Sequence, residues 1–402
     1  MKLLLIDSLL SGHHLNYLKL TLTAFIADGH ECDILLQKKQ VTKEIESSLY
    51  NLGVKKIHLI DLKDTPEKVL KRFHWFGLQI YYFYIYRKLL PKIIKAQNID
   101  KVWFCTIDNL FHVWGLLGSP TRKTPASGLC MQQRVGLREM GIDVQQEKYP
   151  AIKRALFLRT LKSSSLSSMC TILKPTYDYI ESEFPTLKQK FFYVADPIHI
   201  PSRIPRNEAL TMLGLKDETC LIVVYGSIYE RKGVFDLLKA MQSKNWPLKA
   251  RIIFAGKQHE NTRNRILDEY ASELKTAKLQ VIDRFLTSEE EKAIYSITDL
   301  MWVGYSKGFA ANSGVLLQAV ASGIPVVGND HGMIGDFLRK NKNVGYIVNT
   351  TNPQEIAKTV TTFTKDKWII PEKTSKRVLT EHSKTSFQSS LVQTLTINYS
   401  IQ

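Results

Sequence analysis

Short apolar runs alternate with longer helix-like stretches along nearly the whole chain, and this alternation limits the fold more than any other feature. KLLLID at residues 2–7 predicts a strand, the following stretch predicts a helix that ends at Gly29, and ECDILL predicts the next strand. Strands that alternate with helices favour a doubly wound parallel sheet, so we expect an α/β fold. Further strands of the first half are predicted at KKIHLI, DKVWFCT, SMCTIL and KFFYVA.

A proline-rich break divides the pattern near residue 200. Pro197, Pro201 and Pro205 lie close together there, as is common in linkers. The alternation then restarts, and 402 residues are too many for one core. We therefore expect two α/β domains, residues 1–197 and 198–384. Strands of the second domain are predicted at CLIVVYGS, ARIIFAG, KLQVID, DLMWVGY, IPVVGN and VGYIVN.

The charge of the chain indicates an anionic partner. Lys and Arg number 55 against 38 Asp and Glu, a net charge of +17, which suits phosphate groups, nucleic acid or an acidic membrane, although a solvated basic surface explains much of it. The five scattered cysteines show no Cys-x-x-Cys spacing, which favours reduced thiols in the cytoplasm and argues against a zinc site. Because Asp7 interrupts the first apolar run, a buried strand is expected there rather than a signal peptide.

Residues 68–97 combine basic and aromatic side chains. The stretch contains seven Lys or Arg, no acidic residue and many Phe, Tyr and Trp. Such a helix suits the surface of an anionic membrane, which predicts peripheral binding at the inner face of the plasma membrane. A core helix with a basic solvent edge is the alternative. No nucleic-acid motif accompanies the charges, so we expect no nucleic-acid partner.

Three loops have the features of phosphate-binding sites, which in parallel sheets lie where strands end and helices begin. The first is IDSLLSGHHLNY. Gly12 would let the backbone approach a ligand closely, and His13 and His14 could donate hydrogen bonds to a phosphate or a sugar hydroxyl. An ordinary strand-to-helix turn is the alternative.

The second loop, YGSIYERKG, follows the predicted strand that ends at Gly226. Arg231 and Lys232 stand at the start of the next helix. Positive charges there oppose the helix dipole unless an anion is shared, which indicates an anion site. Two solvated charges are the alternative.

The third loop, KGFAANSG, precedes an apolar helix that Asn312 or Ser313 would cap. Its small residues leave room above the helix N-terminus, where the amides of Gly314 and Val315 would point. Helical side chains lean toward the N-terminus, so Gln318 would reach the same place. A surface glutamine is the alternative.

Several motifs that would indicate other nucleotide-binding enzymes or a metal site are absent from the sequence. The sequence contains no G-x-G-x-x-G and no G-x-x-x-x-G-K-[ST], which argues against dinucleotide enzymes and P-loop ATPases. It also contains no Asp-x-Asp pair. We therefore expect no metal or other cofactor, and the charge of a diphosphate would fall to Lys, Arg and helix dipoles.

Three segments together resemble one known family. YGSIYERKGVFDLLKAM, then IIFAGK, then AIYSITDLMWVGYSKGFAANSGVLLQAVASGIPVVGNDHG resemble the C-terminal domain of group 1 (family 4) glycosyltransferases over about residues 196–365. The resemblance implies the GT-B fold, with two Rossmann-like domains facing across a cleft and a final helix, about residues 385–402, that returns to the first domain. It also implies retaining, metal-independent transfer of a sugar from a nucleotide-sugar donor to a glycan, lipid-linked or small hydroxyl acceptor.

The resemblance also assigns roles to residues. Lys232 matches a lysine that contacts the donor diphosphate, and Arg231 replaces a charge lost at Ser227. The residues predicted to bind the diphosphate are Gly12, Ser227, Arg231, Lys232, Ser313, Gly314 and Val315. Those predicted to bind the nucleoside are Phe285, Leu286 and Gln318.

The sequence departs from the family at two glutamates separated by seven residues, where it has Ala310 and Gln318. Gln318 can still hydrogen-bond a ribose diol, so Gln318→Glu is expected to be tolerated, whereas Ala310 cannot replace a carboxylate. A nucleotide-sugar epimerase of the same fold, or a non-catalytic partner in a glycan-assembly complex, are the alternative functions.

His13 and Asp108 are the predicted catalytic residues. Asp108 follows the strand KVWFCT, where it would orient an acceptor hydroxyl or stabilise oxocarbenium-like charge. An aspartate that caps the next helix is the alternative.

Overall fold

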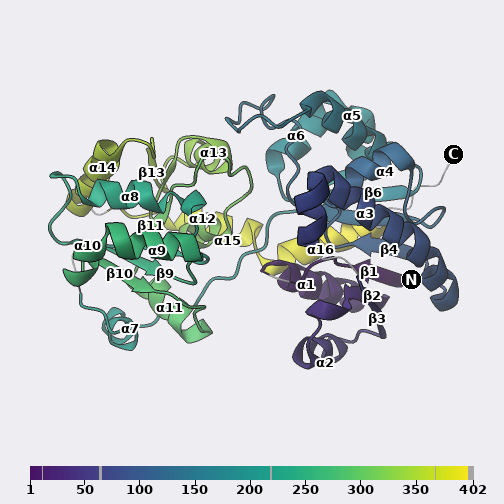
Figure 1. The fold of residues 1–402 in the computed structure, drawn as a ribbon, viewed down its shortest axis with the longest axis horizontal. Coiled ribbons are helices and arrows are strands. Elements are labelled where there is room, and N and C mark those ends of the chain that lie inside the picture. Colours follow the sequence, from purple (N-terminus) through teal and green to yellow (C-terminus); the bar gives the residue numbers. More distant parts are fainter. Residues whose placement is uncertain (11, 63–65, 218–219, 367, 397–402) are drawn as a thin grey trace. The chain divides into compact units, whose positions relative to one another are not determined.

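The chain divides into two compact units (Figure 1). Unit 1 comprises Met1–Gly141, Gln146–Ala195 and Lys384–Gln402, and unit 2 comprises Ile142–Gln145 and Asp196–Ser383. The computed structural model describes residues 1–10, 12–62, 66–217, 220–366 and 368–396, without the side chains of 66–75 and 396. Each unit is a doubly wound α/β structure, as the alternation of strands and helices predicts.

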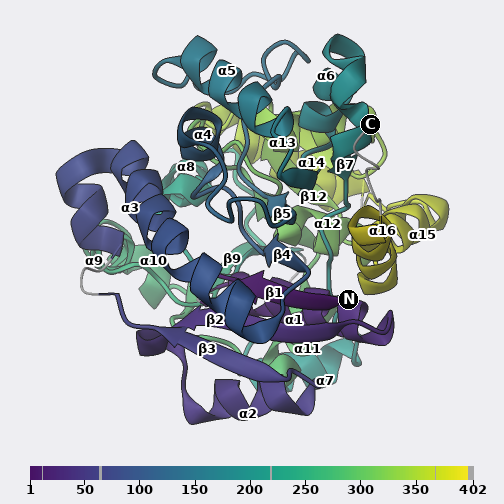
Figure 2. The same ribbon diagram turned by 90° about the vertical axis from the view of Figure 1, so that its right-hand side faces the viewer.

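Unit 1 contains a seven-stranded sheet in the order β3-β2-β1-β4-β5-β6-β7. Its strands are β1 (Lys2–Ile6), β2 (Glu31–Gln37), β3 (Lys56–Ile60), β4 (Lys101–Phe104), β5 (Ala126–Cys130), β6 (Leu166–Thr171) and β7 (Phe191–Tyr193). All neighbouring strands are parallel. Figure 2 shows β3, β2, β1, β4 and β5 following one another in this order.

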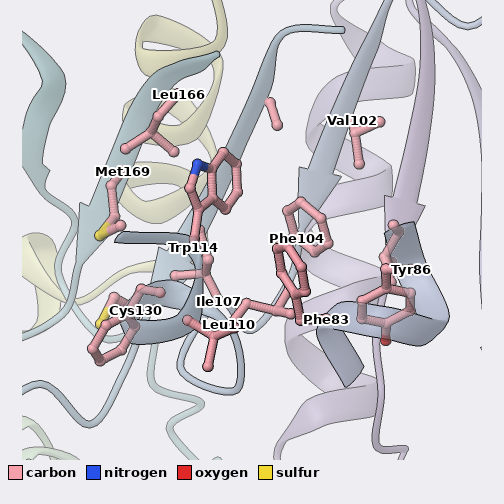
Figure 3. Close-up of a cluster of buried hydrophobic side chains, with 14 of the residues drawn as sticks. Phe83, Tyr86, Val102, Phe104, Ile107, Leu110, Trp114, Cys130, Leu166 and Met169 are labelled. Atoms are coloured by element: carbon pink, nitrogen blue, oxygen red, sulfur yellow. The ribbon is translucent and has the colours of Figure 1, made fainter. Parts of the chain in front are cut away.

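Helices cover both faces of this sheet. They are α1 (His14–Ala27), α2 (Lys43–Asn51), α3 (Pro66–Gln97), α4 (Phe111–Leu117), α5 (Pro150–Leu161), α6 (Lys174–Glu183) and α16 (Lys384–Thr396). Phe104 and Met169 contribute to the core beneath α3–α6, part of which Figure 3 shows. The adjacent Trp103 and Cys170 point the other way, where Trp103 contacts Phe25 of α1 and Cys170 contacts Thr394 of α16.

The aromatic residues of α3 are largely core residues, as the core-helix alternative predicts. Tyr82, Phe83 and Tyr86 are buried in the unit 1 core, part of which Figure 3 shows, and the ring centres of Tyr86 and Phe104 lie 6.0 Å apart. Tyr84 is the exposed aromatic residue among 76–97, with 61% of its surface accessible. Over these residues α3 is a core helix with a basic solvent edge, and the side chains of 68–75 lie outside the described residues. No helix in the described part of the chain has the length and apolar character needed to cross a membrane.

Unit 2 contains a six-stranded parallel sheet in the order β10-β9-β8-β11-β12-β13. Its strands are β8 (Cys220–Tyr225), β9 (Ala250–Ala255), β10 (Leu279–Ile282), β11 (Leu300–Val303), β12 (Val326–Asn329) and β13 (Gly345–Val348). Its helices are α7 (Arg206–Leu213), α8 (Val234–Met241), α9 (Glu260–Glu269), α10 (Ala271–Lys275), α11 (Ser288–Ile297), α12 (Gly314–Ala321), α13 (Gly332–Lys340), α14 (Pro353–Asp366) and α15 (Glu372–Glu381). All six strands predicted for this half are present.

Candidate functional site

Two loops of unit 2 meet at the carboxyl ends of the central strands. One leads from β8 to α8, and the other leads from β11 to α12. Gly233 has φ +61°, and a Cβ atom there would lie 1.9 Å from the carbonyl oxygen of Gly304. Only glycine permits this close approach in a left-handed conformation. The indole Nε1 of Trp302 adds a second link by donating to the carbonyl of Lys232 over 2.8 Å.

Lys232 is buried between these loops, with 7% of its surface exposed. Its Nζ donates to the carbonyl oxygen of Tyr225 and lies 6.0 Å from the centre of the Tyr305 ring. Burial, together with the neighbouring charge of Arg231, lowers the pKa of Lys232 to about 7. No carboxylate pairs with it among the described residues. A buried amine without a counter-ion favours binding of an anion.

Arg231 adds a second cation at the same loop. Its side chain is exposed, and its guanidinium lies 5.2 Å from the ring centre of Tyr229 and 5.8 Å from that of Phe309. Its carbonyl accepts a 2.8 Å hydrogen bond from the amide of Ser306. The charge therefore stands in water beside the loop that enters α12.

The N-terminus of α12 supplies amide donors. Ser313 caps the helix, because its Oγ accepts from the amide of Leu316 over 3.2 Å, which confirms one of the two predicted caps. The amides of Gly314 and Val315 have no acceptor among the described residues. No atom lies within 4 Å of the position that a Cβ of Gly314 would take. Free amides, open space and the helix dipole together suit an anion.

Tyr305 connects the lysine to these amides. The Oγ of Ser313 donates to its hydroxyl over 3.4 Å, and Lys232 lies near its ring. Two residues that the sequence analysis missed hold Tyr305 in place. Asn329 Oδ1 accepts from its amide over 2.8 Å, and His331 Nε2 lies 3.1 Å from its carbonyl oxygen. Their position directly at the end of a predicted strand was the available signal.

The side chain of Gln318 on α12 is hydrogen-bonded to a glutamate of another helix. Its Nε2 donates to Oε1 of Glu291 over 3.2 Å, and the hydroxyl of Tyr225 donates to the same oxygen over 2.8 Å. Glu291 was also missed. It lies in the first turn of α11 among three consecutive glutamates, a pattern that by itself indicates only a helix start.

A cavity of about 410 Å³ opens nearby in unit 2. The predicted residues Ser227 and Phe285 line it, and 79% of the Phe285 surface is exposed. The rings of Tyr229 and His259 lie 5.3 Å apart on another part of its wall. Leu286 packs against the core of unit 2 instead. The cavity therefore offers aromatic faces for a flat ligand group.

Ala310 is buried, with 5% of its surface exposed. It lies in the loop between β11 and α12, close in sequence to the amides described above. The structure thus provides no carboxylate from this residue.

The remaining predicted residues belong to unit 1. Gly12 has φ +62° and open space where a Cβ would be. His13 is exposed, and it precedes α1 without a side-chain capping bond. Its neighbour His14 is the engaged histidine, because its Nδ1 lies 3.1 Å from Thr106 Oγ1 and 3.4 Å from Asp7 Oδ1. Burial alone would lower the pKa of His14, but the hydrogen bond and charge of Asp7 raise it.

Asp108 closes a loop rather than capping a helix. Its two carboxylate oxygens accept from the amides of Met131 (2.9 Å) and Gln132 (2.8 Å), which follow β5. Helix α4 begins after Leu110 without a side-chain cap, so the helix-capping alternative is wrong. Burial raises the pKa of Asp108, although these hydrogen bonds act in the opposite direction.

Comparisons with known proteins bear on both units. Residues 206–380 match the family model described as "Glycosyl transferases group 1". No significant match was found among curated protein sequences.

Solved structures resemble the whole chain. Anabaena HepE, solved with UDP, is 13% identical with a TM-score of 0.68, and the match covers 98% of this chain and 99% of that one. Sucrose-phosphate synthase from Thermosynechococcus elongatus is 13% identical with a TM-score of 0.68 over 98% of both chains. WaaG, a glycosyltransferase involved in lipopolysaccharide biosynthesis, is 12% identical with a TM-score of 0.63 over 100% of both chains.

At these identities the solved structures establish the fold, and the family model establishes the kind of domain. The matched residues 206–380 include the loops around Lys232 and Ser313. Residues 206–380 are therefore a group 1 glycosyl transferase domain, and the chain that carries them is a glycosyltransferase of the GT-B fold.

Proposed function

We propose that the protein transfers a sugar from a nucleoside-diphosphate sugar to a hydroxyl acceptor, with retention of configuration and without a metal ion. The observation that carries the proposal is the buried ammonium of Lys232, which lacks a carboxylate partner in the described chain and lies near the Tyr305 ring that also contacts Ser313. A diphosphate fits these charges. Its negative charge would compensate Lys232 and Arg231, and its oxygens would accept from the amides of Gly314 and Val315.

The nucleoside would occupy the cavity beside this site. Phe285 and Tyr229 present aromatic faces to it, and Ser227 lies on the wall. Aromatic faces stack on nucleobases. HepE, which shares the fold, was solved with UDP, and this supports a uridine nucleotide as the first ligand to test.

The reaction would break the bond between the anomeric carbon and the diphosphate oxygen, which leaves with the electron pair. The acceptor hydroxyl oxygen would bond to that carbon on the same face, and its proton would pass to the departing diphosphate. Lys232, Arg231 and the α12 amides would stabilise the charge that develops on this oxygen. Because Ala310 supplies no carboxylate at the transferred sugar, the leaving group itself is the base in this scheme.

Unit 1 would bind the acceptor, which we propose is a glycan, a lipid-linked glycan or a small hydroxyl compound. Gly12, His13 and Asp108 remain proposed site residues, and His14 with its partner Asp7 adds a polar pair after β1. The fold shared with WaaG supports a glycan-building role. Five free, buried cysteines fit a reducing cytoplasmic setting, and the exposed lysines of α3 leave a role at an anionic membrane surface open to test.

Calorimetric titration with UDP, GDP and ADP tests the donor site. We expect one of them to bind with micromolar affinity, and the corresponding sugar donors to release free nucleotide only when an acceptor is present. Isomerised donor without released nucleotide would identify an epimerase instead. If none of the three nucleotides binds, the proposed transferase is wrong and a non-catalytic partner role gains support.

A further inference from the structure

Helix α5 of unit 1 has one buried face and one exposed face. On the buried face, Phe157 and Leu161 belong to the unit 1 core. Helical residues separated by seven or three positions lie on the same side, so an exposed stripe runs along the helix from Ile152. With the two residues before the helix, this exposed face comprises Lys148, Tyr149, Ile152, Arg159 and Lys162, hereafter the α5 surface.

Two large apolar side chains of the α5 surface are in contact with water. Tyr149 has 73% of its surface exposed, and Ile152 has 60%. Helix α4 lies beside α5 (Figure 1), since a Cβ at Gly115 of α4 would lie 2.1 Å from the carbonyl oxygen of Leu156. The two leucines that follow Gly115 are exposed too. Exposed apolar side chains that gather on adjoining helices indicate an interaction surface.

The charge of the α5 surface is entirely positive. Positions 148–162 contain five Lys or Arg and no acidic residue. Two of these cations have acidic neighbours. Lys153 lies 2.9 Å from the carboxylate of Glu147, and Arg154 lies 3.7 Å from that of Glu139. The other three belong to the α5 surface, and none of them has a carboxylate partner in the part of the chain that the structure describes.

The solvent edge of α3 is also basic, but its apolar side chains are mostly covered. Lys88, Lys92 and Lys95 are exposed there. Among residues 76–97, Tyr84 is the exposed large apolar side chain. Basic and apolar side chains are thus exposed together on α5, and α3 provides a matched surface for comparison.

We propose that the α5 surface binds the face of a membrane that contains anionic phospholipids. Lys148, Arg159 and Lys162 pair with the lipid phosphates, each of which carries a negative charge. Tyr149 and Ile152 enter the headgroup region, where an amphipathic helix buries its apolar side chains. The charges attract the protein to the bilayer, and the apolar side chains distinguish a bilayer from a soluble polyanion.

The place of α5 in the fold connects this surface to the acceptor. Helices that follow parallel strands begin at the carboxyl edge of the sheet, so Tyr149 lies toward the edge where Asp108 binds the amides that follow β5. A membrane at the α5 surface therefore favours a lipid-linked acceptor. This choice of acceptor rests on the proposed function, whereas membrane binding does not depend on it.

Co-sedimentation of the whole chain with vesicles tests the proposal. One set of vesicles contains phosphatidylcholine alone, and the other contains equal parts of phosphatidylcholine and phosphatidylglycerol. We expect wild type to bind the anionic vesicles at least about tenfold more tightly, and high salt to weaken this binding. Each basic residue near the lipid contributes about fivefold, so Lys148→Gln, Arg159→Gln and Lys162→Gln combined should weaken binding by at least about tenfold.

The matched control changes the net charge equally on α3. Combining Lys88→Gln, Lys92→Gln and Lys95→Gln also removes three exposed positive charges from unit 1. It should weaken binding by about twofold at most, because salt screens charges that lie away from the lipid. Circular dichroism shows whether each variant is folded.

The apolar contribution is measured separately. Tyr149→Ser with Ile152→Ser should weaken binding to the anionic vesicles by about tenfold, and should leave binding to heparin, a soluble polyanion, unchanged. The control pair, Tyr84→Ser with Ile369→Ser, removes comparably exposed side chains elsewhere. It should leave binding to both unchanged.

Three outcomes would overturn the proposal. One is equal binding of wild type to both kinds of vesicle. Another is equal weakening by the α5 and α3 triple variants, which would mean that attraction depends on net charge alone. The third is vesicle binding that does not change in Tyr149→Ser with Ile152→Ser, which would make the surface a general polyanion site. Nucleotide titrations are independent of these measurements, so failure of membrane binding leaves the transferase proposal intact.

Discussion

Lys232 shows how a single residue acquires its chemistry from its surroundings. Its ammonium contacts a backbone carbonyl and an aromatic ring, and these replace little of the hydration that it lost. The pKa near 7 means that the free protein holds this lysine only partly charged at neutral pH. A bound diphosphate would restore the full charge.

Replacing this lysine should weaken binding of a nucleoside diphosphate. We expect Lys232→Ala to cost about 1.5–3 kcal/mol of binding free energy, the range for a charge-assisted hydrogen bond. The control is Lys239→Ala, which removes an exposed lysine from α8. Titration calorimetry compares the variants, and equal affinities for all three proteins would remove Lys232 from the site.

The lowered pKa also predicts how binding depends on pH. Above pH 7 the free protein has lost the proton from Lys232, and the complex regains it because an anion raises this pKa. Affinity should therefore fall by up to about tenfold per unit as the pH rises above 7, with proton uptake on binding. Below pH 7 the ionisation of Lys232 adds no pH dependence to the binding affinity. Titrations from pH 7.5 to 9 in two buffers with different ionisation enthalpies measure it, and Lys232→Ala should show a flatter profile.

Some residues of the candidate site stand out in the sequence and others do not. Lys232 and Ser313 stand out because a charge opposes a helix dipole and a serine precedes an apolar helix. Glu291 cannot be found this way, because its partner Gln318 is brought to it only when α11 and α12 pack on the sheet. Which of His13 and His14 makes the contacts with Asp7 and Thr106 similarly depends on the residue at which α1 begins. A sequence predicts that residue only to within one or two positions.

The loops that follow the strands determine where the residues of the candidate site lie. The left-handed turn at Gly233 holds two loops within contact, and those loops carry Lys232 and the residues around Tyr305. Disturbing one turn should therefore disturb the site and the fold together.

Gly233→Ala tests this element. We expect a loss of about 1–2 kcal/mol from the left-handed backbone and about 1–3 kcal/mol more from the clash with Gly304. Gly214→Ala is the matched control, since Gly214 has φ +64° but open space around its Cβ position. Urea unfolding of both variants separates the two contributions. Similar losses in both would show that the contact with Gly304 is unimportant.

The sequence patterns predicted some helices and strands better than others. The strand β5, ASGLC, was not predicted because it contains no β-branched residue, yet it pairs with β4 and β6 inside the sheet. In α3, composition suggested a membrane surface, but Tyr82, Tyr86 and Leu90 recur at four-residue spacing and are all buried. That spacing is the signal of a core-facing helix stripe, and composition alone does not contain it.

At the scale of the whole molecule, the alternation of strands and helices predicted two doubly wound units because every parallel connection needs a crossover. The strand order did not follow from the sequence, since it depends on which side of β1 and β8 each crossover returns. The net charge of +17 indicated anionic ligands without placing them.

Donor binding should survive a chelator. Lys232 and Arg231 offer two positive charges to the diphosphate, so the site does not require a divalent ion for charge balance. We expect the same affinity for nucleoside diphosphate with and without EDTA. Binding that disappears in EDTA and returns with Mg²⁺ or Mn²⁺ would contradict the metal-independent proposal.

The position of α16 makes unit 2 an insertion within unit 1. Lys101 of β4 donates to the carbonyl of Leu395, and Ser168 of β6 donates to that of Thr394, so the last helix belongs to the first sheet. During synthesis, unit 1 therefore waits for its final layer until unit 2 has been made, roughly 10–40 s at usual elongation rates. Until then one apolar face of its sheet is partly uncovered, and this nascent intermediate is the stage at which the chain is most exposed to aggregation and most dependent on chaperones.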